Sequence, residues 1–276
     1  MELEELVQLV APNATYKDIS SGGNWVFRLL EENGVTSILK VYNGPSRERR
    51  ERHALEALAG VMGVPKILER ANTEGRHWIR MTDGGTWDLA SLPRNLDIVR
   101  NAGRVLRGVH ESHVQLTNLA NSIDNDNIDA HYLSTLSRLE RYRRRLGFSP
   151  FLLDAARAAG SPHASTPRPA HTRPTPEQFL VTETGQVTLI DWEWATMAPP
   201  EWDVSLASWQ LANLLGDQAA AAFIEGYGAA VSAARLRPWI AYHAAMIMLD
   251  AAEKRDGRLH DLAPMVRSMA DAVGYG

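Results

Sequence analysis

The strongest constraint on the fold is that strand patterns and helix patterns occupy different parts of the chain. The first third predicts a β-hairpin, because two apolar runs, residues 25–30 and 35–42, flank a Glu-Glu-Asn-Gly turn. Two further short strands are expected within residues 64–85. From Asp88 onward, apolar residues recur at the three- and four-residue spacing of helices. The chain therefore predicts an α+β protein.

Each part contains one exception to its pattern. In the first part, residues 47–60 predict a helix, with Ser46 as its N-cap and Gly60 as its end. In the second part, residues 179–195 predict another hairpin, with Glu-Thr-Gly at its turn. The preceding tract, residues 161–176, contains five prolines and is either a linker or a loop that must be held open.

This order of elements is the layout of a two-lobed, protein-kinase-like fold. We expect residues 1–82 to form a small β-rich lobe that binds nucleotide, followed by a connector near residues 82–85. Residues 83–276 are expected to form a larger helical lobe, in which residues 169–194 supply the embedded hairpin.

Composition narrows the functional classes. The chain of 276 residues has no apolar run long enough to span a membrane, and its acidic, amphipathic start differs from a secretory signal, so we expect a soluble, cytoplasmic protein without a membrane partner. The absence of cysteine excludes disulfides, thiolate zinc sites and cysteine nucleophiles. A net charge of -4 predicts no nucleic-acid partner. The basic runs at residues 47–52 and 138–147 indicate solvated helix faces or a docking surface for an acidic partner.

Two patterns in the first lobe suggest a binding site for nucleotide phosphates. Lys40 lies on a predicted strand and Glu51 on the helix that follows, an arrangement in which a carboxylate can hold an ammonium near phosphates. The segment Ser21, Gly22 and Gly23 offers backbone N–H groups without bulky side chains. Surface residues and an ordinary turn are the alternative interpretations.

Two acidic residues after the second hairpin suggest a metal-binding site. Asp191 ends an apolar strand, which places its carboxylate on a rigid element, and Glu193 follows two residues later. Mg²⁺ prefers one or two such carboxylates together with phosphate oxygens. The alternative is that Asp191 caps the turn after the strand.

Residues 171–210 resemble the aminoglycoside phosphotransferase and choline kinase family. That family has a loop of the form His-Gly-Asp-x-x-Pro-x-Asn-x-Leu-Val, then a hairpin, Ile-Asp-Trp/Phe-Glu and a helix that starts Pro-x-x-Asp-Leu-Ala. Here the segments HTRPTPEQFLV, LIDWE and PPEWDVSLA occupy these places. The resemblance extends upstream through Lys40 and the Arg50-Glu51 pair to about Ser20.

The resemblance implies the roles of several residues. ATP would bind between the lobes, with its adenine at the connector of residues 81–85, including Met81 and Asp83. Asp191 would hold Mg²⁺, and Asp203 would be a buried acid that supports the catalytic loop.

The departures from the family lie in the catalytic loop. His171 and Pro176 match, but Arg173 stands at the position of the catalytic aspartate, Thr172 at that of the glycine and Gln178 at that of the metal-binding asparagine. Gln178 keeps an amide oxygen for the metal on a longer side chain, so we expect Asp191, Gln178 and Glu193 as metal ligands.

Arg173 changes the chemistry available to the loop. Arginine cannot accept a proton, since its pKa stays above about 12. Its guanidinium could hold the γ-phosphate, pair with Asp191 in place of a metal, or contact an acidic substrate. His171 is a second candidate catalytic residue, or a structural residue behind the loop. Glu177, Glu193 and Asp126 are other acids that could replace the missing one.

Two functions follow from this pattern. The first is an ATP- and Mg²⁺-dependent phosphotransferase that acts on a hydroxyl of a small molecule or peptide, with Arg173 contacting phosphate or an acidic substrate. The second is a catalytically inactive pseudokinase that scaffolds or activates a partner enzyme, for example in peptide natural-product modification.

Overall fold

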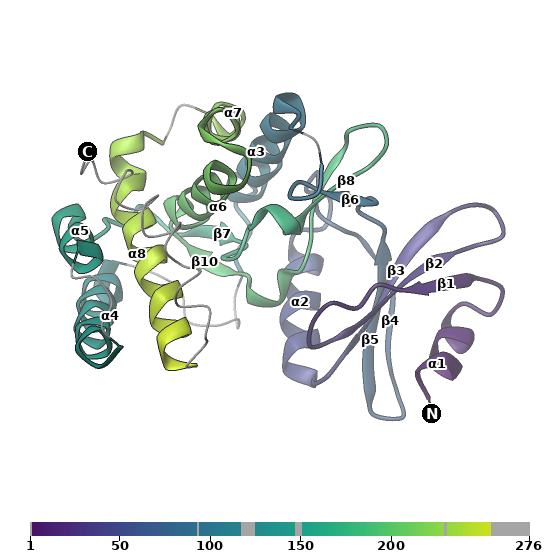
Figure 1. The fold of residues 1–276 in the computed structure, drawn as a ribbon. Helices are drawn as coiled ribbons and strands as arrows, with labels where there is room; N and C mark the ends of the chain where they lie inside the picture. The colour runs from purple at the N-terminus through teal and green to yellow at the C-terminus, as the bar shows by residue number, and fades with distance from the viewer. Residues whose placement is uncertain (1, 93, 117–124, 147–150, 229–230, 255–276) are drawn as a thin grey trace.

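The structure, a computed structural model, describes residues 2–92, 94–116, 125–146, 151–228 and 231–254. A sheet built from the first third of the chain lies at one side, and the helices of the remaining chain gather at the other (Figure 1). The two-lobed α+β arrangement predicted from the sequence is confirmed.

The first lobe is an antiparallel five-stranded sheet in the order β1-β2-β3-β5-β4. Its strands are β1 (Thr15–Asp18), β2 (Trp25–Leu30), β3 (Thr36–Tyr42), β4 (Ile67–Thr73) and β5 (Arg76–Thr82). Helix α1 (Leu3–Val10) packs its buried side chains against one face of this sheet, together with Phe27, Leu39 and Trp78.

The alternation of side chains along β3 decides where Lys40 points. Leu39 and Val41 belong to the core beneath α1, whereas Tyr42 belongs to the core shared with α2 and the second lobe. Lys40 has the same parity as Tyr42, and it pairs with Val26 and Ile79 in the ladder. The hairpin register therefore directs the ammonium toward α2 and away from α1.

Helix α2 (Pro45–Ala57) begins two residues earlier than predicted. Gly44 is the N-cap, and Ser46 lies inside the helix, so the assignment of Ser46 as the cap is wrong. Proline is favoured in the first turn, because it lacks the N–H that would be unsatisfied there and its φ is already helical. The helix ends before Gly60, whose φ of +94° lies in the left-handed region.

The second lobe is mainly helical. Its helices are α3 (Leu96–His110), α4 (Asn125–Leu146), α5 (Phe151–Ala159), α6 (Pro200–Leu215), α7 (Asp217–Tyr227) and α8 (Ala233–Glu253). The predicted hairpin is formed by β8 (Phe179–Val181) and β9 (Val187–Leu189), and β6 (Trp87–Asp88) adds a third strand. Among the described residues, no helix is both long and apolar enough to cross a bilayer.

A short strand pair closes the segment that holds the candidate site. Strand β7 (Arg168–Ala170) pairs with β10 (Thr196–Ala198), and the sequence did not predict this contact. It joins the two ends of residues 171–195, which contain the loop, the hairpin and the short helices η1 (Pro176–Gln178) and η2 (Trp192–Trp194). The last part of the proline-rich tract is therefore held in place by a ladder.

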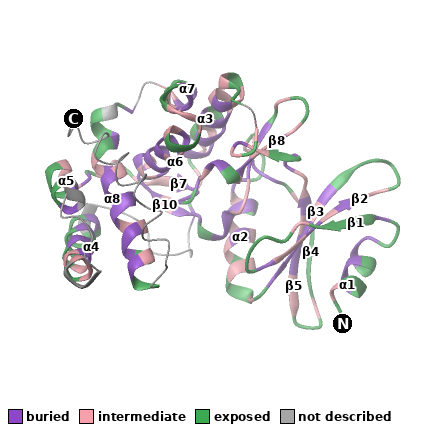
Figure 2. Ribbon diagram, in the orientation of Figure 1, coloured by how far each residue is buried: buried purple, intermediate pink, exposed green. Residues whose placement is uncertain are grey.

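One apolar core connects the lobes. It contains Met81 of β5, Leu55 of α2, Val105 of α3 and Leu189 of β9. Figure 2 shows buried stretches in α2, α3 and β5. The connector is also packed closely, because a Cβ on Gly85 would lie 2.4 Å from the Val181 carbonyl carbon. Both contacts fix the first lobe against the hairpin.

Helices α3 and α7 cross so closely that a glycine is required. A Cβ on Gly103 would lie 2.2 Å from the carbonyl oxygen of Phe223 and 2.7 Å from the backbone nitrogen of Tyr227. Gly108, one and a half turns later in α3, has nothing within 4 Å of the same position.

We predict opposite effects of alanine at these two positions. Gly103→Ala should lower the free energy of unfolding by about 1–3 kcal/mol, because the added methyl group meets backbone atoms and forces the helices apart. Gly108→Ala should be neutral or stabilising by up to about 1 kcal/mol, because alanine favours a helix interior. Urea titrations of both variants measure the difference, and equal effects would show that the crossing is not tight.

Candidate active site

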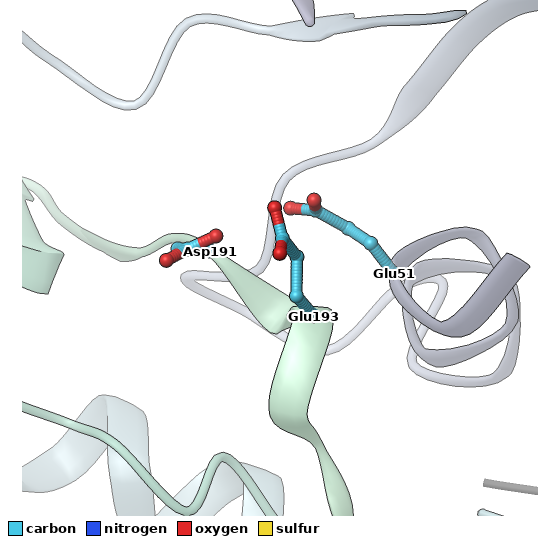
Figure 3. A group of neighbouring side chains, drawn as sticks. All are labelled: Glu51, Asp191 and Glu193. Carbon is cyan, nitrogen blue, oxygen red and sulfur yellow. The ribbon is translucent and has the colours of Figure 1, made fainter. Parts of the chain in front are cut away.

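The candidate site is built around the ammonium group of Lys40. Its Nζ lies 2.6 Å from Oε2 of Glu51, 2.7 Å from Oδ1 of Asp191 and 2.9 Å from Oε1 of Glu193. Figure 3 shows the three carboxylates gathered at one place, Glu51 from α2 and the other two from the segment around η2. The pairing of Lys40 with Glu51 is present, and the same ammonium also binds both acids of the second lobe.

Burial and opposite charge act against each other in this cluster. Burial would lower the pKa of Lys40, but attraction to Glu51, Asp191 and Glu193 outweighs it and raises this pKa well above its ordinary value. Burial raises the pKa of Asp191, yet the charge of Lys40 holds it below its ordinary value. The pKa of Glu51 is raised, because burial dominates there. One ammonium among three carboxylates leaves an excess of negative charge that a bound cation would reduce.

Asp191 is the accessible acid of the cluster. Its side chain is 38% exposed, whereas those of Glu51 and Glu193 are 2% and 4% exposed. Its backbone is left-handed, with φ of +67°, and begins η2. Aspartate tolerates this conformation better than most residues, so one side chain satisfies both the turn and the site.

Three residues that sequence analysis missed complete the cluster. The Tyr42 hydroxyl donates to Oε2 of Glu51 at 2.8 Å, and Arg47 Nη1 lies 3.6 Å from Oε2 of Glu193. The side-chain amide of Asn24 donates to Glu193, and its oxygen accepts from the backbone of Asn43 at 3.2 Å. Tyr42 could have been found from the sequence, because it lies two residues after Lys40 on the same strand and so points to the same side. Asn24 and Arg47 gave no signal of this kind; they only lie close in the chain to Gly23 and to Glu51.

The glycine segment lies next to this cluster. Ser21, Gly22 and Gly23 are exposed in the loop between β1 and β2, and Asn24 joins the end of that loop to Glu193. A Cβ on Gly23 would lie 3.0 Å from Nη1 of Arg47. The loop is therefore held beside Lys40 and Glu193 with its backbone open to solvent.

The backbone of the catalytic loop is held by Asp203 at the start of α6. Its Oδ2 accepts from the backbone N–H of His171 and its Oδ1 from that of Thr172, both at 2.8 Å, and Nε2 of His110 lies 3.2 Å from Oδ2. The indole N–H of Trp202 donates to the Thr172 carbonyl at 2.9 Å. These bonds do not involve the side chain at position 173.

His171, proposed above as a candidate catalytic residue, is buried behind the loop. Its Nε2 donates to the Ile190 carbonyl at 2.7 Å, and its ring packs on Trp192. Burial lowers its pKa. His171 is 0% exposed, and this burial favours the structural role over the catalytic one, which stays untested.

Thr172 adopts a conformation that favours glycine. Its φ is +69°, which costs on the order of 1 kcal/mol for a β-branched residue. Its hydroxyl donates to the Trp194 carbonyl at 2.8 Å, and this bond joins the loop to η2. The threonine thus holds a left-handed turn at the position where the resemblance expects a glycine.

Arg173 is exposed on the loop and does not pair with Asp191, which binds Lys40 instead. Its guanidinium carbon lies 5.6 Å from the ring centroid of Trp194. Of the acids that could replace the missing aspartate, Glu177 is exposed on η1, Glu193 is buried against Lys40, and the side chain of Asp126 lies outside the described residues. Within the described chain, no carboxylate hydrogen-bonds or ion-pairs with Arg173.

The connector candidates occupy different surroundings. Met81 is buried on β5, where it pairs with Ile38 and Ile67. Asp83 is bound by Arg28, with 2.8 Å between Oδ2 and Nε, and Arg28 also donates to the carbonyl of Gly85 at 2.6 Å. This arginine joins β2 to the connector, so the carboxylate of Asp83 is already used within the protein.

The donor set suits Mg²⁺ at Asp191. The ligand atoms of Glu51, Asp191 and Glu193 lie within 4.8 Å of one another, but the two glutamates are buried and bonded to Lys40. The carbonyl of Gln178 accepts from the backbone of Ile190 at 2.9 Å, which places Gln178 beside Asp191. Among the three acids, Asp191 is the one whose exposed carboxylate could hold a cation together with phosphate oxygens, whereas Glu193 binds Lys40 and Asn24. Gln178 as a second ligand stays a prediction.

Comparison with known proteins identifies relatives of this arrangement. The profile described as the phosphotransferase enzyme family matches residues 15–239. No curated protein matches the sequence. Solved structures match over the whole chain, and the likeness shows the same protein-kinase-like fold.

Three of these structures illustrate the range of structural similarity and sequence identity. A mutant of aminoglycoside 2'-phosphotransferase-IIIa in complex with GDP has a TM-score of 0.73 and 14% identity, over 99% of this chain and 98% of that one. A thermostable mutant of aminoglycoside phosphotransferase APH(4)-Ia with ADP and hygromycin B has a TM-score of 0.69 and 15% identity, over 100% of both chains. Macrolide 2'-phosphotransferase MphH from Brachybacterium faecium has a TM-score of 0.65 and 16% identity, over 99% and 98%.

Replacing Lys40 with methionine should destabilise the protein most at high pH. The substitution leaves Glu51, Asp191 and Glu193 without their cation, and breaking a buried ion pair costs about 3–5 kcal/mol. Lys40 lowers the pKa of Glu51 and of Asp191 while burial raises both, so in the variant the folded-state pKa values of these two carboxylates should rise above their unfolded values. The loss of unfolding free energy is therefore full at about pH 8. It is smaller at about pH 5, because there the carboxylates of the folded variant bind protons more readily than those of the unfolded chain.

Urea titrations of parent and variant at the two pH values measure this difference. Lys66→Met is the matched control, because Lys66 is exposed ahead of β4. An equal loss of stability at both pH values in Lys40→Met would contradict the electrostatic interpretation.

Proposed function

Because this chain belongs to the phosphotransferase enzyme family, we propose that it binds ATP with Mg²⁺ and transfers the terminal phosphate to a hydroxyl of a small molecule or peptide. The observation that carries this proposal is the ammonium of Lys40, held between the lobes by three carboxylates of which Asp191 is accessible. A strand lysine paired with a helix carboxylate binds nucleotide phosphates in kinase-like sites. The solved relative with ADP and hygromycin B is consistent with this class of ligand.

Each part of the site has a role in the proposed complex. Lys40 would bind ATP phosphates while Glu51 orients it, and the backbone of residues 21–23 would lie beside the phosphates. Asp191 and Gln178 would hold Mg²⁺, which when bound neutralises charge on the phosphates. The adenine would lie at the connector that follows Met81.

The acceptor side lacks the usual base. In the transfer, the acceptor oxygen forms a bond to the γ-phosphorus, and the bond from that phosphorus to the ADP oxygen breaks. Arg173 cannot take the hydroxyl proton, so we assign that proton to a phosphate oxygen of the transferred group. General base catalysis contributes about 100- to 10,000-fold, whereas positioning and electrostatics supply most of the rate of phosphoryl transfer. We therefore expect slow turnover.

The exposed Arg173 also supports a second function. A loop whose backbone is intact but whose acid is replaced by an exposed cation suits a pseudokinase that scaffolds or activates a partner enzyme. Nucleotide binding is compatible with both functions, so turnover separates them.

We predict that nucleotide binding depends on Asp191 and Mg²⁺. Asp191→Asn should remove the Mg²⁺-dependent part of ADP affinity and weaken binding about tenfold or more, because a neutral amide is a poor partner for this cation. Calorimetric titration of ADP with and without Mg²⁺ measures the effect. Asp97→Asn is the control, since Asp97 is 90% exposed on α3. If the parent chain binds no nucleotide at all, the proposed function is wrong.

A turnover comparison tests the role of Arg173. With a suitable hydroxyl acceptor, the parent should convert ATP slowly, Arg173→Ala should be slower still, and Arg173→Asp should not restore the rate. The reason is that Arg173 contacts an anionic group and does not merely fill the place of the acid. ADP release measured in a coupled assay gives the rates.

The opposite results are equally informative. A large gain of rate in Arg173→Asp would show that the arginine only replaces a lost base. No turnover by the parent, combined with stoichiometric co-purification of another chain, would support the scaffold function.

A further inference from the structure

Two arginines from different lobes share one tryptophan ring beside the candidate site. The guanidinium carbon of Arg50 on α2 lies 4.8 Å from the ring centroid of Trp194, and that of Arg173 on the loop lies 5.6 Å from it. Trp194 is 39% exposed at the end of η2. The ring therefore joins the first lobe to the catalytic loop through two cations.

Neither guanidinium forms an ion pair within the described part of the chain. No carboxylate there ion-pairs with Arg50 or Arg173, and Nε of Arg50 is buried without a hydrogen-bond partner. The three acids nearby are bound to Lys40, and Arg47, one turn before Arg50, already faces Glu193. Arg173 is exposed and Arg50 is partly exposed, so both positive charges remain without an ion-pair partner beside the same ring.

The aromatic ring does not remove this excess of charge. Contact with a ring face at an exposed site is a weak attraction, and it orients a guanidinium while leaving its charge in place. The planar donors of arginine match the two oxygens of a phosphate or carboxylate, and they bind such groups bidentately. An oxyanion is the ligand that would satisfy both arginines.

We propose that Arg50, Arg173 and the ring of Trp194 form an oxyanion site that binds a phosphate or carboxylate group of the acceptor molecule. The inference rests on the proposed function for its place beside a nucleotide, and it narrows the acceptor to anionic molecules. A polycationic acceptor would be repelled by the same two arginines. The charge of Arg173 contributes, after that of Lys40, to the lowered pKa of Asp191, but no acid of the Lys40 cluster forms an ion pair with Arg50 or Arg173.

Titration with inorganic phosphate, and separately with acetate, tests this site without any nucleotide. Calorimetry should detect phosphate binding to the parent, and Arg50→Gln and Arg173→Gln should each weaken it about tenfold or more, as expected for loss of a charge-assisted hydrogen bond. Arg49→Gln is the matched control, because Arg49 carries the same charge on the same helix and is exposed. It should leave phosphate affinity unchanged.

If a glutamine variant folds poorly, other variants of the same residues still test the oxyanion site. Arg50→Lys and Arg173→Lys retain the charge and lose the planar pair of donors, so they should bind phosphate with intermediate affinity. Trp194→Leu should also weaken binding, because both guanidiniums lose the surface that orients them. Thermal unfolding identifies any variant whose fold is lost.

Nucleotide competition distinguishes the source of the oxyanion. Phosphate should still bind in the presence of saturating ADP–Mg²⁺ and of AMP-PNP–Mg²⁺, because the acceptor group and the nucleotide occupy different places. Expulsion of phosphate by AMP-PNP but not by ADP would assign the arginines to the terminal phosphate of ATP and would overturn the acceptor site. No binding of phosphate or acetate to the parent, or equal loss in Arg49→Gln, would overturn the oxyanion site itself.

A failure of the oxyanion site can be distinguished from a failure of the proposed nucleotide binding. ADP–Mg²⁺ affinity depends on Lys40 and Asp191, so it should persist in the Arg50 and Arg173 variants. Loss of phosphate binding with intact ADP binding concerns only the arginine site.

Discussion

The ammonium of Lys40 is the interaction on which the relation between the lobes depends. It lies on β3 and binds Glu51 of the first lobe together with Asp191 and Glu193 of the second. Buried ion pairs of this kind add little net stability, because the cost of removing the charges from water offsets their attraction. Their value is positional: one cation holds three acids in a fixed arrangement. The three carboxylates carry more negative charge than the one ammonium neutralises, and this excess suits a ligand that binds together with a metal cation.

The catalytic loop is supported independently of its central side chain. Asp203 accepts from two successive backbone N–H groups, Trp202 donates to the Thr172 carbonyl, and the Thr172 hydroxyl reaches Trp194. The carbonyl of Trp202 in turn accepts from Nε2 of the buried His243 at 2.9 Å. These contacts hold the backbone while position 173 faces solvent. The loop can therefore change its chemistry from acid to cation without losing its shape.

Much of the fold followed from local patterns. The hairpins β2–β3 and β8–β9 were predicted because apolar runs flank recognisable turns, and these are short-range features. The pairing of β7 with β10 was not, because each strand has only three residues and their partners lie far apart in the chain. The start of α2 was misplaced by two residues, since both Pro45 and Ser46 carry signals for a first turn.

The sequence by itself determined the division into a β-rich and a helical lobe, because strand and helix patterns occupy different parts of the chain. It also predicted Lys40, Glu51 and Asp191 as residues of one site, from the order of strand and helix and from the family motifs. Only the tertiary structure decided what these residues contact. It placed Glu193 on Lys40, buried His171 behind the loop and brought Arg50 to the same ring as Arg173. These outcomes depend on how α2 packs against η2, and such long-range packing has no signal in the spacing of residues.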